Sequence, residues 1–193
     1  VRLRLSAYDV DKAEATKAIE SEFNKLSAVI GDNIVGYEGE SIEHLIHQRL
    51  TEQGLTLAVA ESCTGGAITS KFTAMAGASQ YFLAGVVSYS NESKRDILGV
   101  RMADIEQYGA VSEEVARQMA EGVRRITGSD YALATTGIAG PGGGSEAKPI
   151  GTVWMALATP TATYAQMRNS GNDRGQVISR ATAYALDMLY DEL

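Results

Sequence analysis

Hydrophobic positions along the chain follow two different periods, and together they predict alternating strands and helices. Nearly continuous apolar runs at 55–60, 81–88 and 131–136 are typical of strands that are buried on both faces. Apolar residues at helical spacing predict helices between these runs, most of them bounded by a capping residue and a glycine. The predicted helices, with their flanking caps, lie at 41–54, 67–77, 90–99, 112–128 and from 173 onward.

Two more apolar runs, at 149–158 and 161–167, flank a turn at Thr159-Pro160 and predict a hairpin at one sheet edge. Strands and helices that alternate and end in a hairpin predict a three-layer α/β/α sandwich with a mixed, mainly parallel sheet. In such sheets, ligands bind at the carboxyl ends of the strands. We therefore expect the functional residues in the turns that follow the predicted strands.

The first 38 residues predict a small β-α-β unit that precedes this sandwich. Residues 1–8 alternate between apolar and polar, as in a half-exposed strand, and 34–37 predict a second short strand. Between them, Asp11 and Glu14 form a capping box at the start of an amphipathic helix. The chain opens without Met and directly in a strand-like pattern, which predicts that it is the later part of a longer polypeptide.

Composition and charge limit the classes of function. The 193 residues, 45% of them hydrophobic, suffice for one packed domain with a small appendage. A net charge of −7 disfavours sequence-independent binding of nucleic acid, which needs a basic surface. Neither a membrane span nor a secretory signal is recognisable, so the sequence predicts a cytoplasmic protein that does not bind membranes.

The sequence offers little for a metal or another cofactor, and none is predicted. Cys63 is the single cysteine, which excludes an intramolecular disulfide framework and disfavours a zinc site built on thiolates. His44 and His47 are three residues apart, but no further ligand type accompanies them. Surface or packing roles are therefore favoured for both histidines.

The first candidate chemistry lies in the turn after the run at 55–60. Ser62 stands where a strand ends and a helix begins, and the free N–H groups there suit a developing oxyanion or a phosphate. Gly65 and Gly66 would let a ligand approach the backbone closely. An equally weighted alternative is that Ser62 or Thr64 merely caps the following helix.

Two further turns carry candidate residues. Tyr89 and Lys94 follow the run at 81–88, and they would share a sheet edge with Ser62 if the two strands are parallel neighbours. Spacing alone favours a packing aromatic and a solvated lysine at these positions. The stretch 137–145 follows the third strand, and so many glycines in one connection indicate a ligand-binding loop.

Four ordered blocks of sequence resemble the signatures of the CinA C-terminal family of nicotinamide-nucleotide amidohydrolases. The similarity runs from about residue 40 to residue 190. The blocks are Ala60-Glu61-Ser62-Cys63-Thr64-Gly65-Gly66, Tyr89-Ser90-Asn91-Glu92-Ser93-Lys94, Gly109-Ala110-Val111-Ser112 and Thr136-Gly137-Ile138-Ala139-Gly140-Pro141. Residues 1–38 resemble the KH-type connecting segment that follows a nucleotide-pyrophosphatase domain in two-domain CinA proteins. The resemblance thus implies a KH-like segment at 1–38, an amidohydrolase domain at 39–193 and an upstream domain in the full-length chain.

The resemblance implies that nicotinamide mononucleotide is deamidated to nicotinic acid mononucleotide and ammonia, without a metal, in pyridine-nucleotide salvage. The nucleophile of the family maps to Ser62, its lysine to Lys94 and its tyrosine to Tyr89. For this chemistry Lys94 must be buried and neutral to act as a base, and we expect Tyr89 to relay the proton. Oxyanion donors are expected from the Ser62 turn or the glycine-rich loop.

Substrate binding is expected at the same edge of the sheet, through exposed N–H groups and a bidentate phosphate contact from Arg174 or Arg180. The chain reads Ser170-Gly171-Asn172-Asp173-Arg174 where family members commonly carry Pro-Gly-Asp-Arg, which leaves the register and role of the arginine open. The predicted substrate-binding residues are Thr64, Gly65, Gly66, Thr136, Gly137, Ile138, Ala139, Gly140 and Arg174.

Three alternatives stay open at this point. Cys63 is a rival nucleophile, because a thiolate is more reactive than a hydroxyl, although neighbouring residues leaving a strand usually point in different directions. The domain could instead be a nucleotide-binding or regulatory module without activity, or a serine amidase that acts on another small amide. Short strands with exposed edges also favour a homo-oligomer, a dimer or higher.

Overall fold

The computed structural model describes residues 3–8, 11–31 and 41–193, which belong to two compact units, Val1–Glu40 and Ser41–Leu193. In the first unit, α1 (Lys12–Ile30) begins as predicted at Asp11, whose carboxylate accepts the N–H groups of Ala13 and Glu14. The strand expected at 1–8 is wrong over its described part, because 3–8 form no strand. A strand needs a partner for its backbone groups, and the second strand expected at 34–37 lies outside the described residues. The KH-like identity of this unit stays a prediction.

The second unit contains a five-stranded sheet in the order β2-β1-β3-β4-β5. Its strands are β1 (Leu57–Glu61), β2 (Phe82–Val87), β3 (Tyr131–Gly137), β4 (Thr152–Ala158) and β5 (Thr163–Asn169). The central strand β1 pairs in parallel with β2 and β3, whereas β4 is antiparallel to both β3 and β5. Only β4 therefore opposes the common direction within the described sheet, and the mixed, mainly parallel arrangement with its terminal hairpin is confirmed.

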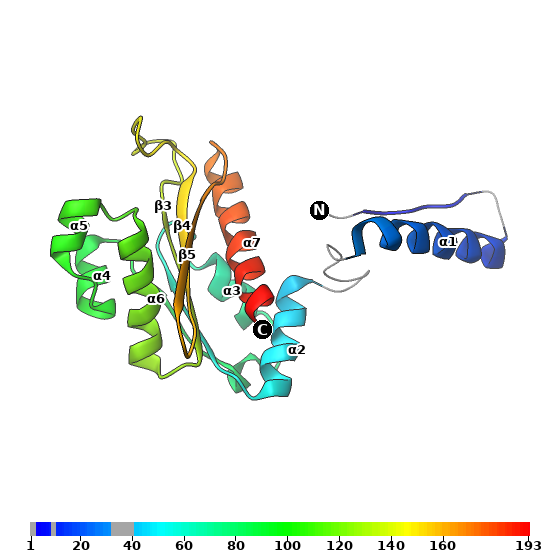
Figure 1. Cartoon of the computed structure of the whole chain (residues 1–193), viewed down its shortest axis with the longest axis horizontal. Helices are drawn as coiled ribbons and strands as arrows, with labels where there is room; N and C mark the ends of the chain where they lie inside the picture. Colours follow the sequence, from blue (N-terminus) through cyan, green and yellow to red (C-terminus); the bar gives the residue numbers. More distant parts are fainter. Residues whose placement is uncertain (1–2, 9–10, 32–40) are drawn as a thin grey trace. The chain divides into compact units, whose positions relative to one another are not determined.

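Helices cover both faces of this sheet, so the predicted α/β/α sandwich is confirmed (Figure 1). One layer holds α2 (Ile42–Gln53), α3 (Ala67–Thr73) and α7 (Arg174–Glu192), with the short 3₁₀ helix η2 (Ala78–Gln80) nearby in the chain. The other layer holds α4 (Asn91–Leu98), α5 (Met102–Tyr108) and α6 (Glu113–Thr127). No helix in the described part of the chain is both long enough and apolar enough to cross a lipid bilayer.

The central strand shows why its sequence is apolar throughout. Leu57 and Val59 pack into the core under α2, α3 and α7, whereas Ala58 and Ala60 face the opposite core under α6. Successive side chains of a strand point to opposite faces, and here both faces are covered. Alanines on the α6 side keep that layer close to the sheet, and Gly122 of α6 leaves no room for a Cβ against the carbonyl of Leu98.

Most helix boundaries follow the capping residues that predict them. Ser90, Ser112 and Asp173 each accept a backbone N–H at the start of their helix, and left-handed glycines end α2, α4 and α6. Helix α5 is not among the helices expected from the sequence. This helix has seven residues, and Arg101, which precedes it, forms no capping hydrogen bond with its side chain.

Candidate active site

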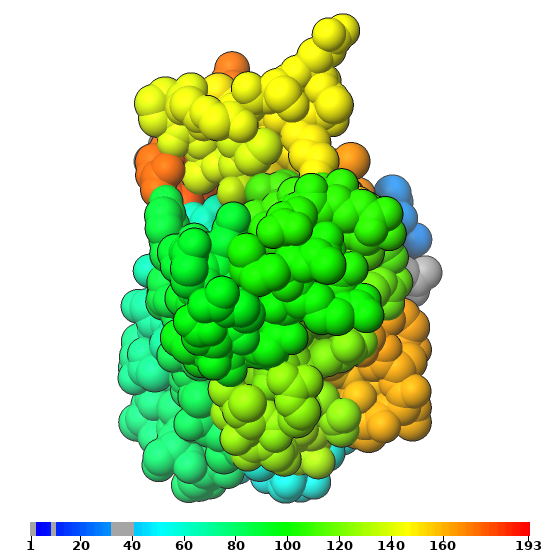
Figure 2. Space-filling view, turned by 90° about the vertical axis from the view of Figure 1, so that its left-hand side faces the viewer, coloured from blue at the N-terminus to red at the C-terminus, as the bar shows by residue number. Residues whose placement is uncertain are grey.

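The register of the parallel strands brings the predicted turns together at one edge of the sheet. Glu61 at the end of β1 is level with Val87 in β2 and Thr135 in β3. The N–H of Ser62 continues this pattern by donating to the carbonyl of Thr135 at 3.0 Å. The turns after β1, β2 and β3 therefore open on the same edge, as the sequence predicts, and Figure 2 shows the yellow loop after β3 above the green segments that follow β2.

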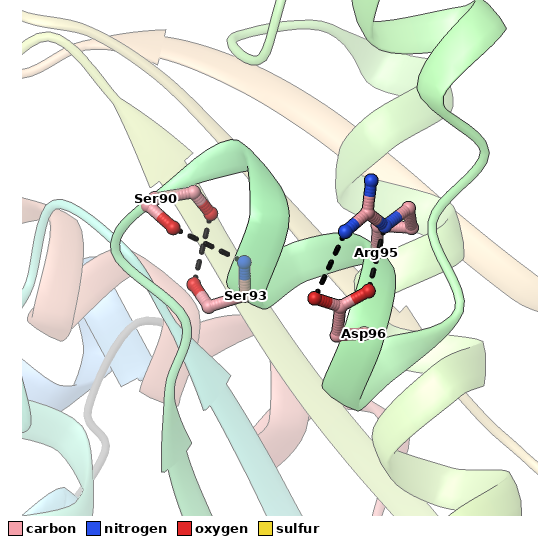
Figure 3. A network of polar contacts seen from close by, with 4 residues as sticks. All are labelled: Ser90, Ser93, Arg95 and Asp96. Atoms are coloured by element: carbon pink, nitrogen blue, oxygen red, sulfur yellow. Dashed lines mark hydrogen bonds and ion pairs between the residues drawn. The ribbon is translucent and has the colours of Figure 1, made fainter.

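Helix α4 carries Lys94 into this edge. Ser90 fixes the first turn of α4, because its hydroxyl accepts the N–H of Ser93 at 3.1 Å while the hydroxyl of Ser93 donates back to its carbonyl (Figure 3). Arg95 and Asp96 pair with each other at the exposed surface of the helix. Lys94 is only 1% exposed, so the alternative of a solvated lysine is wrong.

The amine of Lys94 has three oxygen neighbours. Its Nζ lies 3.1 Å from Ser62 Oγ, 2.8 Å from the carbonyl oxygen of Ser88 and 3.2 Å from that of Tyr89. Burial lowers the pKa of Lys94 below its ordinary value, because the charged form loses its hydration. A neutral amine has two N–H donors and one lone pair. The two carbonyls can take both donors, which leaves the lone pair to accept the hydroxyl proton of Ser62.

Cys63 is placed unfavourably for a nucleophile. Its side chain is 5% exposed, and burial raises the pKa of the thiol to about 12. The negative charge of Glu61 contributes in the same direction. The sulfur lies against β3, 3.0 Å from the point that a Cβ on Gly137 would occupy. The thiol is therefore protonated at neutral pH and packs against a strand, which favours Ser62 over Cys63.

Glu61 explains the turn that follows Ser62, and sequence analysis missed it. Its buried carboxylate accepts the N–H groups of Gly66, Ile68 and Thr69 at 2.9–3.1 Å. These are the free donors of the amino end of α3, so the expectation that they meet a phosphate or oxyanion is wrong. A carboxylate just before a predicted helix start was the available signal.

The other residues of this turn have local structural tasks. Gly65 and Gly66 adopt positive φ angles of 61° and 98°, which glycine tolerates best. The hydroxyl of Thr64 is buried and shares a 2.7 Å hydrogen bond with that of Thr135. The N–H groups of Cys63 and Thr64 form no hydrogen bond with the described part of the chain. They are the donors that stay available beside Ser62.

The glycine-rich loop joins β3 to β4 and lies beside the Ser62 turn. Thr136, before the loop, donates its hydroxyl to the carbonyl of Ala110 at 2.8 Å, and Ile138 donates its N–H to Thr152. The N–H groups of Ala139 and Gly140 form no hydrogen bond with the described residues, although both residues are buried. Amides without a partner in the protein are available to bind a ligand.

Tyr89 and Arg174 meet at the surface of the site. Tyr89 is 60% exposed, and its hydroxyl accepts a hydrogen bond from Arg174 at 3.2 Å. Arg174, the first residue of α7, also donates to the carbonyl of Gly140 at 2.8 Å. No hydrogen bond joins the Tyr89 hydroxyl to Ser62 or Lys94 in the described structure, and the predicted proton relay stays a prediction. Tyr89 instead contributes its carbonyl to Lys94, a backbone contact that no side-chain motif signals.

These features define a class of α/β/α sandwich proteins with a buried serine–lysine pair at the carboxyl edge of the sheet. Residues 39–193 match the family described as the CinA C-terminal domain. The chain belongs to this CinA family.

Individual relatives agree with this assignment. The chain is 46% identical over 194 residues to a CinA-like protein of Shewanella sediminis, which covers 100% of this chain and 45% of that protein. It is 50% identical over 165 residues to a CinA-like protein of Shewanella loihica, covering 85% and 39% of the two chains. The chain thus spans less than half the length of these curated relatives.

A solved structure shares the fold as well as the sequence. The crystal structure of the competence/damage inducible protein CihA from Agrobacterium tumefaciens superposes with a TM-score of 0.75 at 37% identity. The match covers 81% of this chain and 98% of that chain. The sandwich described here is therefore the fold of a CinA-family structure.

Glu61 generates a first prediction, on stability. Replacing Glu61 with Ala leaves the buried amide of Ile68 and the half-buried amides of Gly66 and Thr69 without their acceptor, and a buried unpaired donor costs about 1–3 kcal/mol. We expect the free energy of unfolding to fall by roughly 3 kcal/mol or more in Glu61→Ala. Urea unfolding followed by fluorescence measures this, because Trp154 in β4 is the single tryptophan. The matched control Glu121→Ala, on an exposed position of α6, should change little, and an equal loss in both variants contradicts the capping role.

Lys94 generates a second prediction, on pH. Its pKa is lowered in the folded chain and returns to the ordinary 10.5 on unfolding, so between these values the unfolded state binds more protons. Stability conferred by wild-type Lys94, relative to Lys94→Met, should therefore rise with pH up to 10.5. Urea unfolding from neutral to alkaline pH measures the difference between the two proteins. A difference that stays flat over this range would mean that burial does not penalise the ammonium.

Proposed function

We propose that this chain hydrolyses the carboxamide of nicotinamide mononucleotide, giving nicotinic acid mononucleotide and ammonia through an acyl-enzyme on Ser62. The observation that carries the reaction type is the 3.1 Å contact between Ser62 Oγ and the buried amine of Lys94. The names of the relatives state CinA membership or induction by competence or damage, and no substrate. The choice of substrate therefore rests on the resemblance of the four sequence blocks.

The first step activates the nucleophile. An amide is a weak electrophile, and a serine hydroxyl is too weak an acid to ionise unaided near neutral pH. Neutral Lys94 takes the proton of Ser62 while Oγ forms a bond to the carboxamide carbon, whose π electrons move to its oxygen. The carbonyls of Ser88 and Tyr89, 2.8 and 3.2 Å from Nζ, remain hydrogen-bonded to the ammonium so formed. General-base assistance of this kind accelerates a reaction by about 10²–10⁴.

The second step expels ammonia. The N–H groups of Cys63 and Thr64 are the candidates for stabilising the tetrahedral oxyanion, since they follow the nucleophile directly and have no acceptor in the described chain. Collapse of the tetrahedral intermediate restores the carbonyl and breaks the C–N bond, and the Lys94 ammonium returns its proton to the leaving nitrogen. Lys94 is then neutral again and can deprotonate the water that hydrolyses the acyl-enzyme.

The remainder of the nucleotide must hold the carboxamide beside Ser62, because orientation supplies a large part of the rate of such reactions. The free N–H groups of Ala139 and Gly140 and the guanidinium of Arg174 are the candidates for the phosphate and ribose. Arg174 is fastened to the loop through Gly140, so both groups would approach the ligand together.

The first test compares the two neighbouring nucleophile candidates. Ammonia and nicotinic acid mononucleotide are measured with purified protein and nicotinamide mononucleotide in the presence of a chelator. Ser62→Ala should lose activity by about 10³-fold or more, because the nucleophile is gone. Cys63→Ala should stay within roughly threefold, since a protonated buried thiol contributes packing alone. The opposite result would reassign the nucleophile, and tight nucleotide binding by wild type without ammonia release would favour the regulatory alternative.

The second test uses the charge state of Lys94. Activity needs the neutral amine, so kcat/KM should rise with pH through an apparent pKa below the ordinary 10.5 of lysine. Lys94→Arg keeps a donor but stays protonated at every accessible pH, so it should remain inactive across the profile. Binding of the product by these variants, measured by calorimetry, separates lost chemistry from a damaged site. A Lys94→Arg variant that retains wild-type turnover would remove Lys94 from the role of base.

A further inference from the structure

The sequence block Gly109-Ala110-Val111-Ser112 has no place in the proposed chemistry, yet it is the hydrogen-bonding partner of the glycine-rich loop. The block connects α5 to α6. The carbonyls of Tyr108, Ala110 and Val111 all accept hydrogen bonds from residues beside the loop, and we call these three groups the carbonyl cluster. Ser112 stabilises the same connection, because its hydroxyl donates to the carbonyl of Gly109 at 2.8 Å.

Both ends of the glycine-rich loop reach the carbonyl cluster. At the β3 end, the buried Thr136 donates to Ala110 at 2.8 Å. At the β4 end, the amine of Lys148 donates to Tyr108 and, at 2.7 Å, to Val111. One short connection thus holds the two ends of the loop at once. In Figure 2 the yellow loop lies against the green surface of this region.

Gly109 is needed for this arrangement. It has a φ of 82°, and a Cβ at this position would lie 3.2 Å from the amine of Lys148. A side chain would therefore be strained and would crowd the ammonium. Lys148 forms no ion pair with the described residues, so carbonyl oxygens are the partners of its charge. Tyr108 is the last residue of α5, where the negative end of the helix dipole favours a cation.

We propose that Lys148 is a positioning residue, which acts through the carbonyl cluster to hold the glycine-rich loop in the conformation that binds the nucleotide. A loop this rich in glycine has many unfolded conformations, so ordering it on binding would weaken affinity. Fastening both ends beforehand removes part of that cost. The inference rests on the proposed function for the identity of the ligand, and on the hydrogen bonds alone for the order of the loop.

The kinetic arm replaces Lys148 with Met, which keeps the aliphatic stem and removes the donor. The loop binds parts of the substrate that do not react, so ground state and transition state should lose the same stabilisation. We expect KM for nicotinamide mononucleotide to rise about tenfold with kcat within roughly threefold, and Lys148→Arg to recover most of the loss. The matched control is Lys71→Met on α3, which removes the ion pair between Lys71 and Glu43 of α2 and should leave both constants unchanged. Loss of kcat with unchanged KM would overturn the assignment.

The second arm needs no substrate. Hydrogen exchange is measured on the ligand-free protein at Ser145, whose N–H donates to the carbonyl of Lys148, and at Gly151, whose N–H donates to Ile138. These amides should exchange about tenfold faster in Lys148→Met, with the amides of β1 unchanged. Thr136→Val should act in the same direction from the other end of the loop.

The two arms separate the possible failures. If wild type releases no ammonia, the proposed function falls while exchange still decides the role of Lys148. If KM rises in Lys148→Met and loop exchange stays at the wild-type rate, Lys148 contacts the nucleotide directly and the positioning role is overturned. Unchanged KM together with unchanged exchange overturns it as well.

Discussion

The contact between the amine of Lys94 and the hydroxyl of Ser62 joins two residues that are 32 positions apart in the chain, and both are buried. Parallel pairing of β1 with β2 provides this, because the two strands end side by side and their following turns share an edge. Ser90 then starts α4 early enough for Lys94 to return into that edge. The chemistry of the site thus depends on strand register first and on side-chain identity second.

Burial disfavours the charged form of an amine, and within the described structure the polar partners of Lys94 are two carbonyl oxygens and the hydroxyl of Ser62, with no carboxylate among them. The backbone carbonyls of Ser88 and Tyr89, in the turn after β2, accept hydrogen bonds from the N–H groups of Lys94. A carboxylate beside Lys94 would raise the pKa of the amine, and a protonated amine cannot act as a base. The carboxylate of Glu61 accepts hydrogen bonds from three amides at the start of α3 instead. Its negative charge therefore stabilises that turn.

The five strands of the sheet, most helices and the serine–lysine pair could be predicted from the sequence, because they follow from periodicity, capping residues and the four blocks. Ser112 and Asp173 show this, since each accepts the N–H that its position predicts. Contacts made by backbone groups leave no such trace, which is why the carbonyls around Lys94 and Lys148 went unrecognised. For Tyr89 the motif identifies the residue but does not indicate which of its groups contacts Lys94. The carbonyl of Tyr89 makes that contact, whereas its hydroxyl meets Arg174.

The site combines two kinds of support. Ser62 directly follows the packed strand β1 and Lys94 lies on the capped helix α4, so packing against the core holds both residues in place. Hydrogen bonds hold the connection between β3 and β4 at two points. Arg174 of α7 donates to the carbonyl of Gly140, and Lys148, which follows the glycine-rich loop, donates to carbonyls of the segment between α5 and α6 and of the last residue of α5. The N–H groups of Ala139 and Gly140 stay available to a ligand, because the bonds made by Arg174 and Lys148 use side-chain donors and carbonyl acceptors.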